Sequence, residues 1–210
     1  MLLKRNPFGE LLREERAALA CVSTEAPAAF LRAAQDGERR VLQLVADHGR
    51  GKSTLLIALQ AREFPETPYT QLHGGDGVPM ANGPMQFVDS IENLSWLGRR
   101  RLYSRCPVLA CTTHRDLSRE LKSAGYEILT MRIGIKSVEE LEDIVKARIA
   151  AAQLPDQAQQ DRSPPTPSRA RLEELYQLHG DDARTIEHAL YQDFERLRSE
   201  GLNSTPTTHV

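Results

Sequence analysis

The 210-residue sequence contains only three cysteines, Cys21, Cys106 and Cys111, which are too few and too unevenly spaced for a disulfide framework or a zinc site. Cys106 and Cys111 adjoin an apolar run, so both are expected to be buried, reduced thiols. No window approaches the roughly 18 apolar residues of a membrane-spanning helix. Residues 1–7 lack the apolar stretch of a signal peptide. We therefore expect a cytoplasmic protein with no membrane partner.

An excess of charge of one sign is also missing. The 27 basic and 29 acidic side chains leave a net charge of −2, whereas nucleic-acid-binding proteins usually carry a basic surplus. Arg99–Arg101 is the only basic strip, so the charge balance gives no support for a nucleic-acid partner. With 40% hydrophobic residues, the chain is long enough for one α/β core and a small accessory subdomain.

Short apolar runs alternate with helical patterns over residues 41–133. This alternation predicts an α/β fold, a three-layer core in which helices cover both faces of a mostly parallel five-stranded sheet. Only 12 residues separate Leu72 from Met85, so the second strand is expected to be a short or antiparallel edge. The five strands are expected at 41–45, 69–72, 85–88, 108–112 and 127–133, and the helices between and before them at 10–21, 25–36, 54–62, 94–103 and 117–124.

The segment ADHGRGKST, from Ala46 to Thr54, is a Walker A pattern with Ala in place of its first glycine. It lies between an apolar strand and a helix, where a glycine-rich loop directs backbone N–H groups at phosphate oxygens. No Asn/Thr-Lys-x-Asp guanine-reading motif is present, which favours ATP over GTP. The residues expected to bind ATP in this loop are Asp47, His48, Gly49, Arg50, Gly51, Lys52, Ser53 and Thr54, with Lys52 near the β- and γ-phosphates and Ser53 on Mg²⁺.

A second motif follows one crossover later, where the apolar strand Phe87-Val88 ends in Asp89. In this position Asp89 is expected to hold Mg²⁺ through water, as a Walker B carboxylate does; the alternative is an exposed residue that caps the next helix. The residue after it is Ser90, and Glu92 lies three positions after Asp89. Glu92 is therefore either the catalytic base that activates water or a surface carboxylate.

The fourth strand ends in Thr112-Thr113-His114. Polar side chains at this place lie beside the γ-phosphate in related P-loop enzymes, so Thr113 and His114 are candidates for catalysis and for sensing the phosphate. His114 is similar to the switch histidine of ABC ATPases. The chain has no LSGGQ-like segment, however, which argues against that family. The alternative is a histidine that caps a helix or lies in a loop.

Together these motifs resemble the AAA+/ASCE group of P-loop ATPases. The resemblance implies that Asn6, in the segment Asn6-Pro7-Phe8, lies near the adenine. It also implies that Arg184, in a segment similar to sensor 2, reaches over the phosphates of bound ATP. The chain departs from the group at Ala46 and Ser90, and the segment between the second and third strands is too short for a substrate-gripping pore loop.

We expect a nucleotide-binding core with an N-terminal helical segment at 1–135, a helical lid at 136–200 interrupted by a Pro/Gln-rich linker at 154–168, and a flexible tail at 201–210. The leading hypothesis is an ATP hydrolase that acts as a nucleotide-dependent switch on a protein partner or in a homo-oligomer. A non-catalytic ATP-binding module and a small-molecule kinase are the alternatives. The sequence names neither the biological process nor an arginine finger.

Overall fold

The computed structural model describes residues 3–35, 37–80, 83–153 and 164–203, without the side chains of 200–203. The chain divides into two compact units. The ranges Met1–Leu12 and Ile135–Val210 contribute to unit 1, and Arg13–Gly134 forms unit 2. Residues up to Leu12 thus group with the C-terminal helices, whereas the sequence suggested that they belong to the core. Most of the expected linker (154–163) and tail (204–210) lies outside the described residues.

Unit 2 contains one five-stranded sheet in the order β2-β3-β4-β1-β5. Every neighbouring pair in it is parallel. The strands are β1 (Arg40–Val45), β2 (Tyr69–Gln71), β3 (Met85–Asp89), β4 (Val108–Thr113) and β5 (Glu127–Arg132); the helices are α1 (Arg13–Leu19), α2 (Glu25–Arg32), α3 (Lys52–Glu63), the short 3-10 helix η1 (Ile91–Asn93), α4 (Trp96–Arg105) and α5 (Ser118–Ser123).

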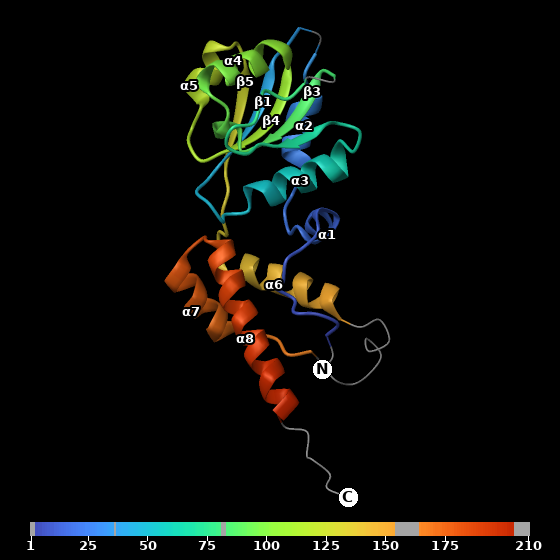
Figure 1. Cartoon of the computed structure of the whole chain (residues 1–210), viewed down its shortest axis with the longest axis vertical. Helices are drawn as coiled ribbons and strands as arrows, with labels where there is room; N and C mark the ends of the chain where they lie inside the picture. Colours follow the sequence, from blue (N-terminus) through green and yellow to red (C-terminus); the bar gives the residue numbers. More distant parts are fainter. Residues whose placement is uncertain (1–2, 36, 81–82, 154–163, 204–210) are drawn as a thin grey trace, which may run out of the picture. The chain divides into compact units, whose positions relative to one another are not determined.

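The expected three-layer α/β fold is confirmed (Figure 1). The second strand is indeed a short edge strand of three residues, but it pairs with β3 in parallel, so the antiparallel alternative is wrong. The connection of residues 72–84 suffices for a parallel crossover, and its described residues (72–80 and 83–84) contain no helix.

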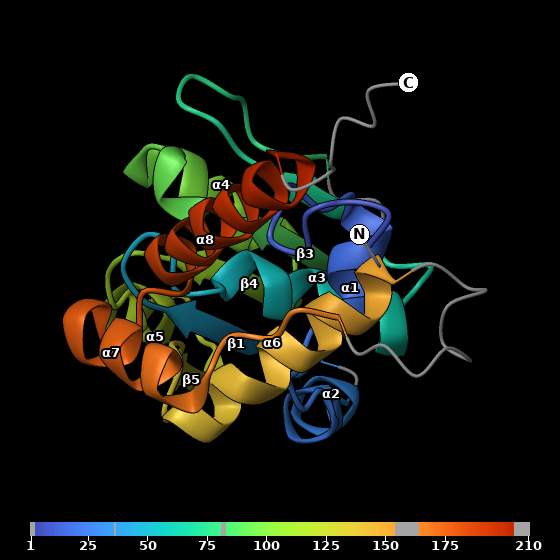
Figure 2. The ribbon, with the colours of Figure 1, turned by 90° about the horizontal axis from the view of Figure 1, so that it is seen from below.

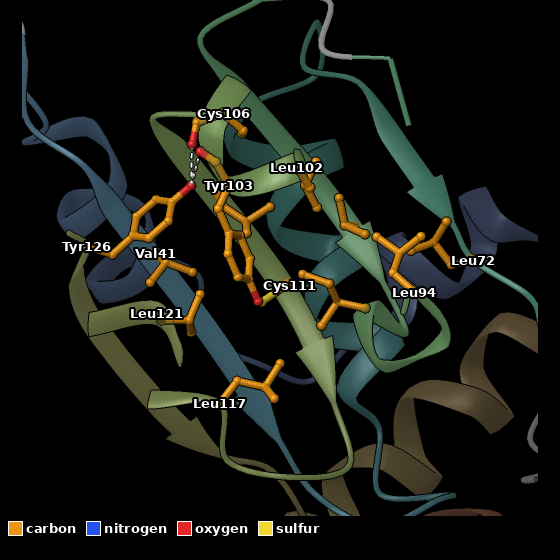
Figure 3. Close-up of a cluster of buried hydrophobic side chains, with 13 residues drawn as sticks. Val41, Leu72, Leu94, Leu102, Tyr103, Cys106, Cys111, Leu117, Leu121 and Tyr126 are labelled. Atoms are coloured by element: carbon orange, nitrogen blue, oxygen red, sulfur yellow. Dashed lines mark hydrogen bonds between the residues drawn. The ribbon is translucent and has the colours of Figure 1, made fainter. Parts of the chain in front are cut away.

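Side chains alternate between the two faces of the sheet, as the period of a strand requires. Val41 and Leu109 pack with α4 and α5 in one buried cluster, which Figure 3 shows. Leu42 and Leu44 point to the opposite face and pack with α2 and α3. The strands read as continuous apolar runs because both faces of this parallel sheet are covered.

Two cysteines lie in the first of these clusters. Cys106 and Cys111 are buried and reduced, as the sequence predicts. Burial raises the pKa of Cys106 to about 11 and also raises that of Cys111. Both thiols are therefore protonated at neutral pH and unsuited to nucleophilic chemistry.

Unit 1 is built from α6 (Val138–Ala152), α7 (Arg169–His179) and α8 (Ala183–Asn203), which Figure 2 draws in yellow, orange and red. The N-terminal segment packs against these helices. The ring of Phe8 meets that of Phe194 edge-on at 5.4 Å between centroids, and Asn6 Nδ2 donates to Glu195 Oε1 at 2.9 Å. Leu3 and Phe8 belong to the same buried cluster as the inward side chains of the three helices.

Arg99 joins the two helices that cover one face of the sheet. Its Nε and Nη2 donate to the carboxylate of Glu120 on α5 at 2.8 and 2.9 Å, and Nη1 donates to the carbonyl of Leu94 at 2.7 Å. The Arg99 side chain is only 5% exposed. It is therefore a buried structural residue, and the basic strip expected at Arg99–Arg101 is reduced to the exposed Arg100 and Arg101.

Replacing Arg99 by Ala should lower the free energy of unfolding of unit 2 by about 2–3 kcal/mol, because a buried, two-pronged charged hydrogen bond is lost and Glu120 stays partly buried without it. Arg101→Ala on the exposed side of the same helix is the matched control and should change it by less than about 0.5 kcal/mol. Urea unfolding followed by the emission of Trp96 measures both. Equal values for the two variants would contradict this role of Arg99.

The contribution of Arg99 should also depend on pH. Burial tends to raise the pKa of Glu120, but the hydrogen bonds and charge of Arg99 outweigh it and hold that pKa below its usual 4.5. Such a group stabilises the fold above its unfolded pKa and loses this effect as the pH falls through the lowered folded value. The stability difference between wild type and Arg99→Ala should therefore shrink below about pH 4.

Candidate functional site

The carboxyl ends of three adjacent strands meet at one edge of the sheet. β1 runs into the Walker A loop, β4 lies next to it and ends at Thr113, and β3 follows and ends at Asp89. The register pairs Val45 with Thr113 and Val88 with Cys111, so these strand ends are level with one another. Crevices outside the carboxyl ends of parallel strands are the usual binding sites of open α/β folds.

The Walker A loop depends on two glycines with left-handed backbone. Gly49 has a φ of 81° and Gly51 a φ of 89°, which side-chain-bearing residues rarely adopt. Gly51 is also the N-cap of α3, and no side chain caps this helix end. The first N–H groups of α3 therefore point outward without a capping side chain, as a helix that receives phosphate requires.

The Lys52 side chain is buried at the centre of this loop. Its ammonium nitrogen lies 2.8 Å from the carbonyl oxygen of Ala46 and 2.7 Å from that of Asp47. The third neighbour is Nδ1 of His114, at 3.3 Å. The same Nδ1 lies 3.2 Å from the carbonyl oxygen of Ala46, so the tautomer of the ring decides whether it accepts from Lys52 or donates to Ala46. On the other side of the ring, Nε2 lies 3.0 Å from Oε1 of Glu92.

These contacts join Lys52, His114 and Glu92 into one chain. His114 is held in place from two sides. Its ring stacks on that of His48 with 3.7 Å between centroids. The loop that follows it is fixed by the buried Gln43, whose Oε1 accepts from the backbone N–H of Leu117 at 2.6 Å.

Glu92 lies in η1, the turn that follows β3. The chain enters this turn through Ser90, which has a left-handed backbone with φ 62° and ψ 51°. This conformation costs about 1–2 kcal/mol for a residue other than glycine, and the Ser90 N–H is bonded to Thr112 Oγ1 at 2.7 Å. Glu92 is 16% exposed and Oε1 faces His114, whereas Oε2 is buried with no hydrogen-bond partner among the described residues. A buried acceptor of this kind fits a bound water.

The Asp89 carboxylate is almost completely buried and accepts hydrogen bonds from three hydroxyl groups. Ser53 Oγ donates to Oδ1 at 3.1 Å and Tyr69 to Oδ2 at 2.9 Å. Thr112 donates to Oδ1 in a short hydrogen bond while it accepts from Ser90. Since Ser53 is in the first turn of α3, this carboxylate joins the Walker A helix to the end of β3.

The Tyr69 hydroxyl stays protonated at neutral pH and donates its hydrogen bond to Asp89. Burial raises the pKa of its hydroxyl, and the neighbouring negative charge of Asp89 and the hydrogen bond to it add to the effect. The ring is held by Arg13 of α1, whose guanidinium carbon lies 4.2 Å from the ring centroid. Arg13 in turn donates to Gln60 of α3 at 3.1 Å.

The oxygen donors at Ser53 and Asp89 fit Mg²⁺, which prefers hydroxyl, carboxylate and water ligands. The protein could supply only part of the coordination shell, because no group of three or more His, Cys, Asp or Glu side chains among the described residues could hold a metal ion. The remaining ligands would have to come from substrate phosphates and water, as is usual for Mg²⁺ at nucleotide sites.

The structure brings together most of the side chains that the sequence predicts. Lys52, His114 and Glu92 are joined by direct contacts, and Ser53 and Asp89 form a second contacting pair. The other Walker A residues, namely Asp47, His48, Gly49, Arg50, Gly51 and Thr54, line the loop and first turn in sequence.

Three other predicted residues are not among these contacting side chains. The hydroxyl of Thr113 is bonded to the backbone of Arg115, at 3.0 Å from its carbonyl. Asn6 and the exposed Arg184, in the first turn of α8, belong to unit 1. Their roles at the nucleotide remain predictions.

Two contacts of Asp89 were not predicted from the sequence. Thr112 faces it because successive side chains of a strand point to opposite faces, so Thr112 rather than its neighbour Thr113 reaches Asp89. The alternation of side chains along the strand could have predicted from the sequence that Thr112 faces Asp89. Tyr69 had no such signal, because its position next to Asp89 depends on the pairing of β2 with β3.

No family model and no curated protein sequence matches this chain. Solved structures do match. The RuvB Holliday junction branch migration motor of Thermotoga maritima matches 90% of this chain and 63% of its own, with 22% identity and a TM-score of 0.55. Domain III of the replication initiation protein DnaA from the same organism matches 92% of each chain, with 12% identity and a TM-score of 0.60. The chain therefore shares the P-loop NTPase fold of RuvB and DnaA domain III, which are AAA+ ATPases.

In this fold β4 lies between the Walker A strand and the strand that ends in Asp89. The chain spans 63% of the RuvB chain, and at these identities the likeness concerns the fold alone. No helix of the described part of the chain is long and apolar enough to cross a membrane.

Tyr69→Phe should lower the free energy of unfolding of unit 2 by about 1–2 kcal/mol, because it removes one of three hydroxyl donors from a buried carboxylate. Tyr191→Phe in α8, where the ring is 37% exposed, is the control with the same chemical change. Urea unfolding of both variants, followed by circular dichroism and Trp96 emission, measures the effect. An unchanged midpoint for Tyr69→Phe would mean that its hydroxyl does not stabilise Asp89.

Proposed function

We propose that this protein binds ATP with Mg²⁺, hydrolyses it, and acts as a nucleotide-dependent switch on a protein partner. The observation that supports this best is the hydrogen bond between Ser53 and Asp89 beside the buried Lys52. It unites the phosphate-binding and metal-binding halves of a Walker site in one cluster. The AAA+-type fold is consistent with it.

The triphosphate of the substrate would bind across the Walker A loop. Its oxygens would accept from the first N–H groups of α3, where the helix dipole favours negative charge. Lys52 would turn from the carbonyl oxygens of Ala46 and Asp47 towards the β- and γ-phosphates. This exchange conserves the number of its hydrogen bonds and replaces two neutral acceptors by charged ones.

Ser53 and Asp89 would hold Mg²⁺, the first directly and the second through water. When bound, the ion neutralises charge that develops on the phosphate oxygens. The short hydrogen bond from Thr112 and the bond from Tyr69 keep the Asp89 carboxylate oriented. Its position is therefore set before the substrate binds.

Glu92 is the proposed general base. Its Oε2 is buried without a partner among the described residues and would accept a proton from the attacking water. The water oxygen then bonds to the γ-phosphorus as the bond from that phosphorus to the bridging oxygen breaks. Hydrolysis yields ADP and phosphate.

His114 is a proposed positioning residue that acts through Glu92. Its Nε2–H donates to Oε1 and leaves Oε2 for water, while Nδ1 accepts from Lys52. When Lys52 moves to the phosphates, His114 loses that donor. The orientation of Glu92 thereby becomes sensitive to the presence of the triphosphate, which is the property a nucleotide switch needs.

Unit 1 is the proposed lid. Arg184 is exposed in the first turn of α8, where a permanently charged, forked donor suits a phosphate. In this proposal Arg184 and Asn6 bind the nucleotide from unit 1, and hydrolysis releases them. The change in lid position is what a protein partner, or a neighbouring copy in a homo-oligomer, would detect.

A non-catalytic ATP-binding module is the second candidate. It is favoured by Ser90, which takes the place of the glutamate that usually follows the Walker B Asp, and by the engagement of Glu92 with His114. In this case ATP would bind through Lys52 and Asp89 with negligible turnover, and the bound state itself would be the signal.

Phosphate release from ATP and Mg²⁺, measured over a range of protein concentrations, separates the two candidates. We expect turnover in the wild type and its loss in Lys52→Ala. Glu92→Gln should reduce it by about 10²-fold or more, because a general base contributes about that factor. His114→Asn should lower kcat with little change in KM. Glu66→Gln, an exposed carboxylate in the turn after α3, is the matched control and should retain activity.

Turnover that rises with protein concentration would indicate that assembly contributes to the site. ATP binding without phosphate release above the Lys52→Ala background would exclude the hydrolase and leave the binding module. Full activity of Glu92→Gln would show that another group activates the water.

A further inference from the structure

Two of the exposed large apolar side chains of unit 2 are consecutive in one helix turn, and a third lies in a loop that approaches this helix. Among its described residues, the large apolar side chains that are exposed are Met80 (78%), Trp96 (53%) and Leu97 (60%). Trp96 and Leu97 form the first turn of α4. Met80 lies in the loop before β3. Val78 of the same loop lies close to α4, 3.5 Å from the position that a Cβ on Gly98 would occupy. Clustered exposed apolar side chains of this kind mark interaction sites.

The same face of α4 carries positive charge without a counter-charge. Arg100, Arg101 and Arg105 are exposed, and none of them forms an ion pair within the described part of the chain. Arg100 instead lies over the ring of Trp96, with its guanidinium carbon 5.0 Å from the ring centroid. The helix sequence WLGRRRLYSR contains no acidic residue. This face therefore stands out in a chain whose net charge is −2.

We propose that the outer face of α4, defined by Trp96, Leu97, Arg100, Arg101 and Arg105, docks an acidic protein segment that also carries apolar side chains. Guanidinium groups bind carboxylates in a fixed, two-pronged geometry. Tryptophan and arginine are the residue types most enriched among the energetically dominant positions of protein interfaces. The apolar side chains of the partner would cover Trp96 and Leu97, and its carboxylates would pair with the three arginines.

A single-stranded nucleic acid is the competing occupant, and the composition of the face argues against it. Binding of single strands combines a basic groove with aromatic ring faces that are free for stacking. Here Arg100 already covers one face of the only tryptophan in the chain. The neighbouring apolar side chains, Leu97 and Met80, are aliphatic and present no ring.

Trp96 provides a built-in readout because it is the only tryptophan. The full chain is titrated with three probes, each watched by Trp96 emission. The first is a 16-residue amphipathic helical peptide with Leu on one side and Glu on the other. The second is the same peptide with Lys at every Glu, and the third is a 16-nucleotide oligothymidylate.

We expect the Glu peptide to shift Trp96 emission to shorter wavelength and to bind with saturation, while the Lys peptide does not bind. Arg100→Glu combined with Arg101→Glu should weaken binding by about tenfold or more, equivalent to about 1.4 kcal/mol. Both side chains are exposed, so the fold should be retained, which circular dichroism checks. Lys146→Glu, which makes one such charge reversal at an exposed residue of α6, should leave the affinity unchanged.

Three results would overturn the proposal. These are an unchanged Trp96 emission with the Glu peptide at millimolar concentration, equal affinity of the wild type and the double variant, and tighter binding of the oligonucleotide than of the Glu peptide. The last result would assign the face to nucleic acid. Since none of the variants touches Lys52, Asp89 or Glu92, the outcome is independent of the proposed ATPase.

Discussion

The buried carboxylate of Asp89 is the point on which the candidate site depends. It takes hydrogen bonds from Ser53 of α3, Thr112 of β4 and Tyr69 of β2, so four elements of unit 2 meet at two oxygen atoms. A carboxylate removed from water is costly unless its lone pairs are occupied. The hydroxyl groups meet that requirement without neutralising the charge, which stays available to a cation. The same contacts that stabilise the strand ends thus orient the carboxylate at which Mg²⁺ is proposed to bind.

A second chain of contacts joins the Walker A lysine to the candidate base. His114 lies between the two, with Nδ1 3.3 Å from the Lys52 ammonium and Nε2 3.0 Å from Oε1 of Glu92. The left-handed Ser90 turns the chain into η1, where Glu92 reaches His114. The absence of a glutamate directly after Asp89 therefore does not leave the site without a carboxylate. The carboxylate comes instead from Glu92 in η1. It contacts His114, which is itself a neighbour of Lys52.

The sequence was most informative where local patterns determine structure. The apolar runs and the glycines of ADHGRGKST identified the sheet and its phosphate loop, because strand burial and left-handed turns are set by a few neighbouring residues. The pairing between distant segments could not be obtained in this way. Tyr69 contacts Asp89 because the edge strand β2 pairs with β3. Arg99 is buried because α4 lies beside α5, which carries Glu120. Both contacts depend on which elements are neighbours in the fold. Glu92 and His114 were proposed separately, and their contact is new from the structure.

Calorimetric titration of the protein with ATP, with Mg²⁺ and with EDTA in its place, tests the central claim most directly. The account predicts that Mg²⁺ strengthens ATP binding to the wild type, that Ser53→Ala and Asp89→Asn remove this gain, and that Lys52→Ala weakens binding under both conditions. ATP binding that is indifferent to Mg²⁺ and to all three substitutions, or no binding at millimolar ATP, would contradict the assignment of Lys52, Ser53 and Asp89 to a nucleotide site.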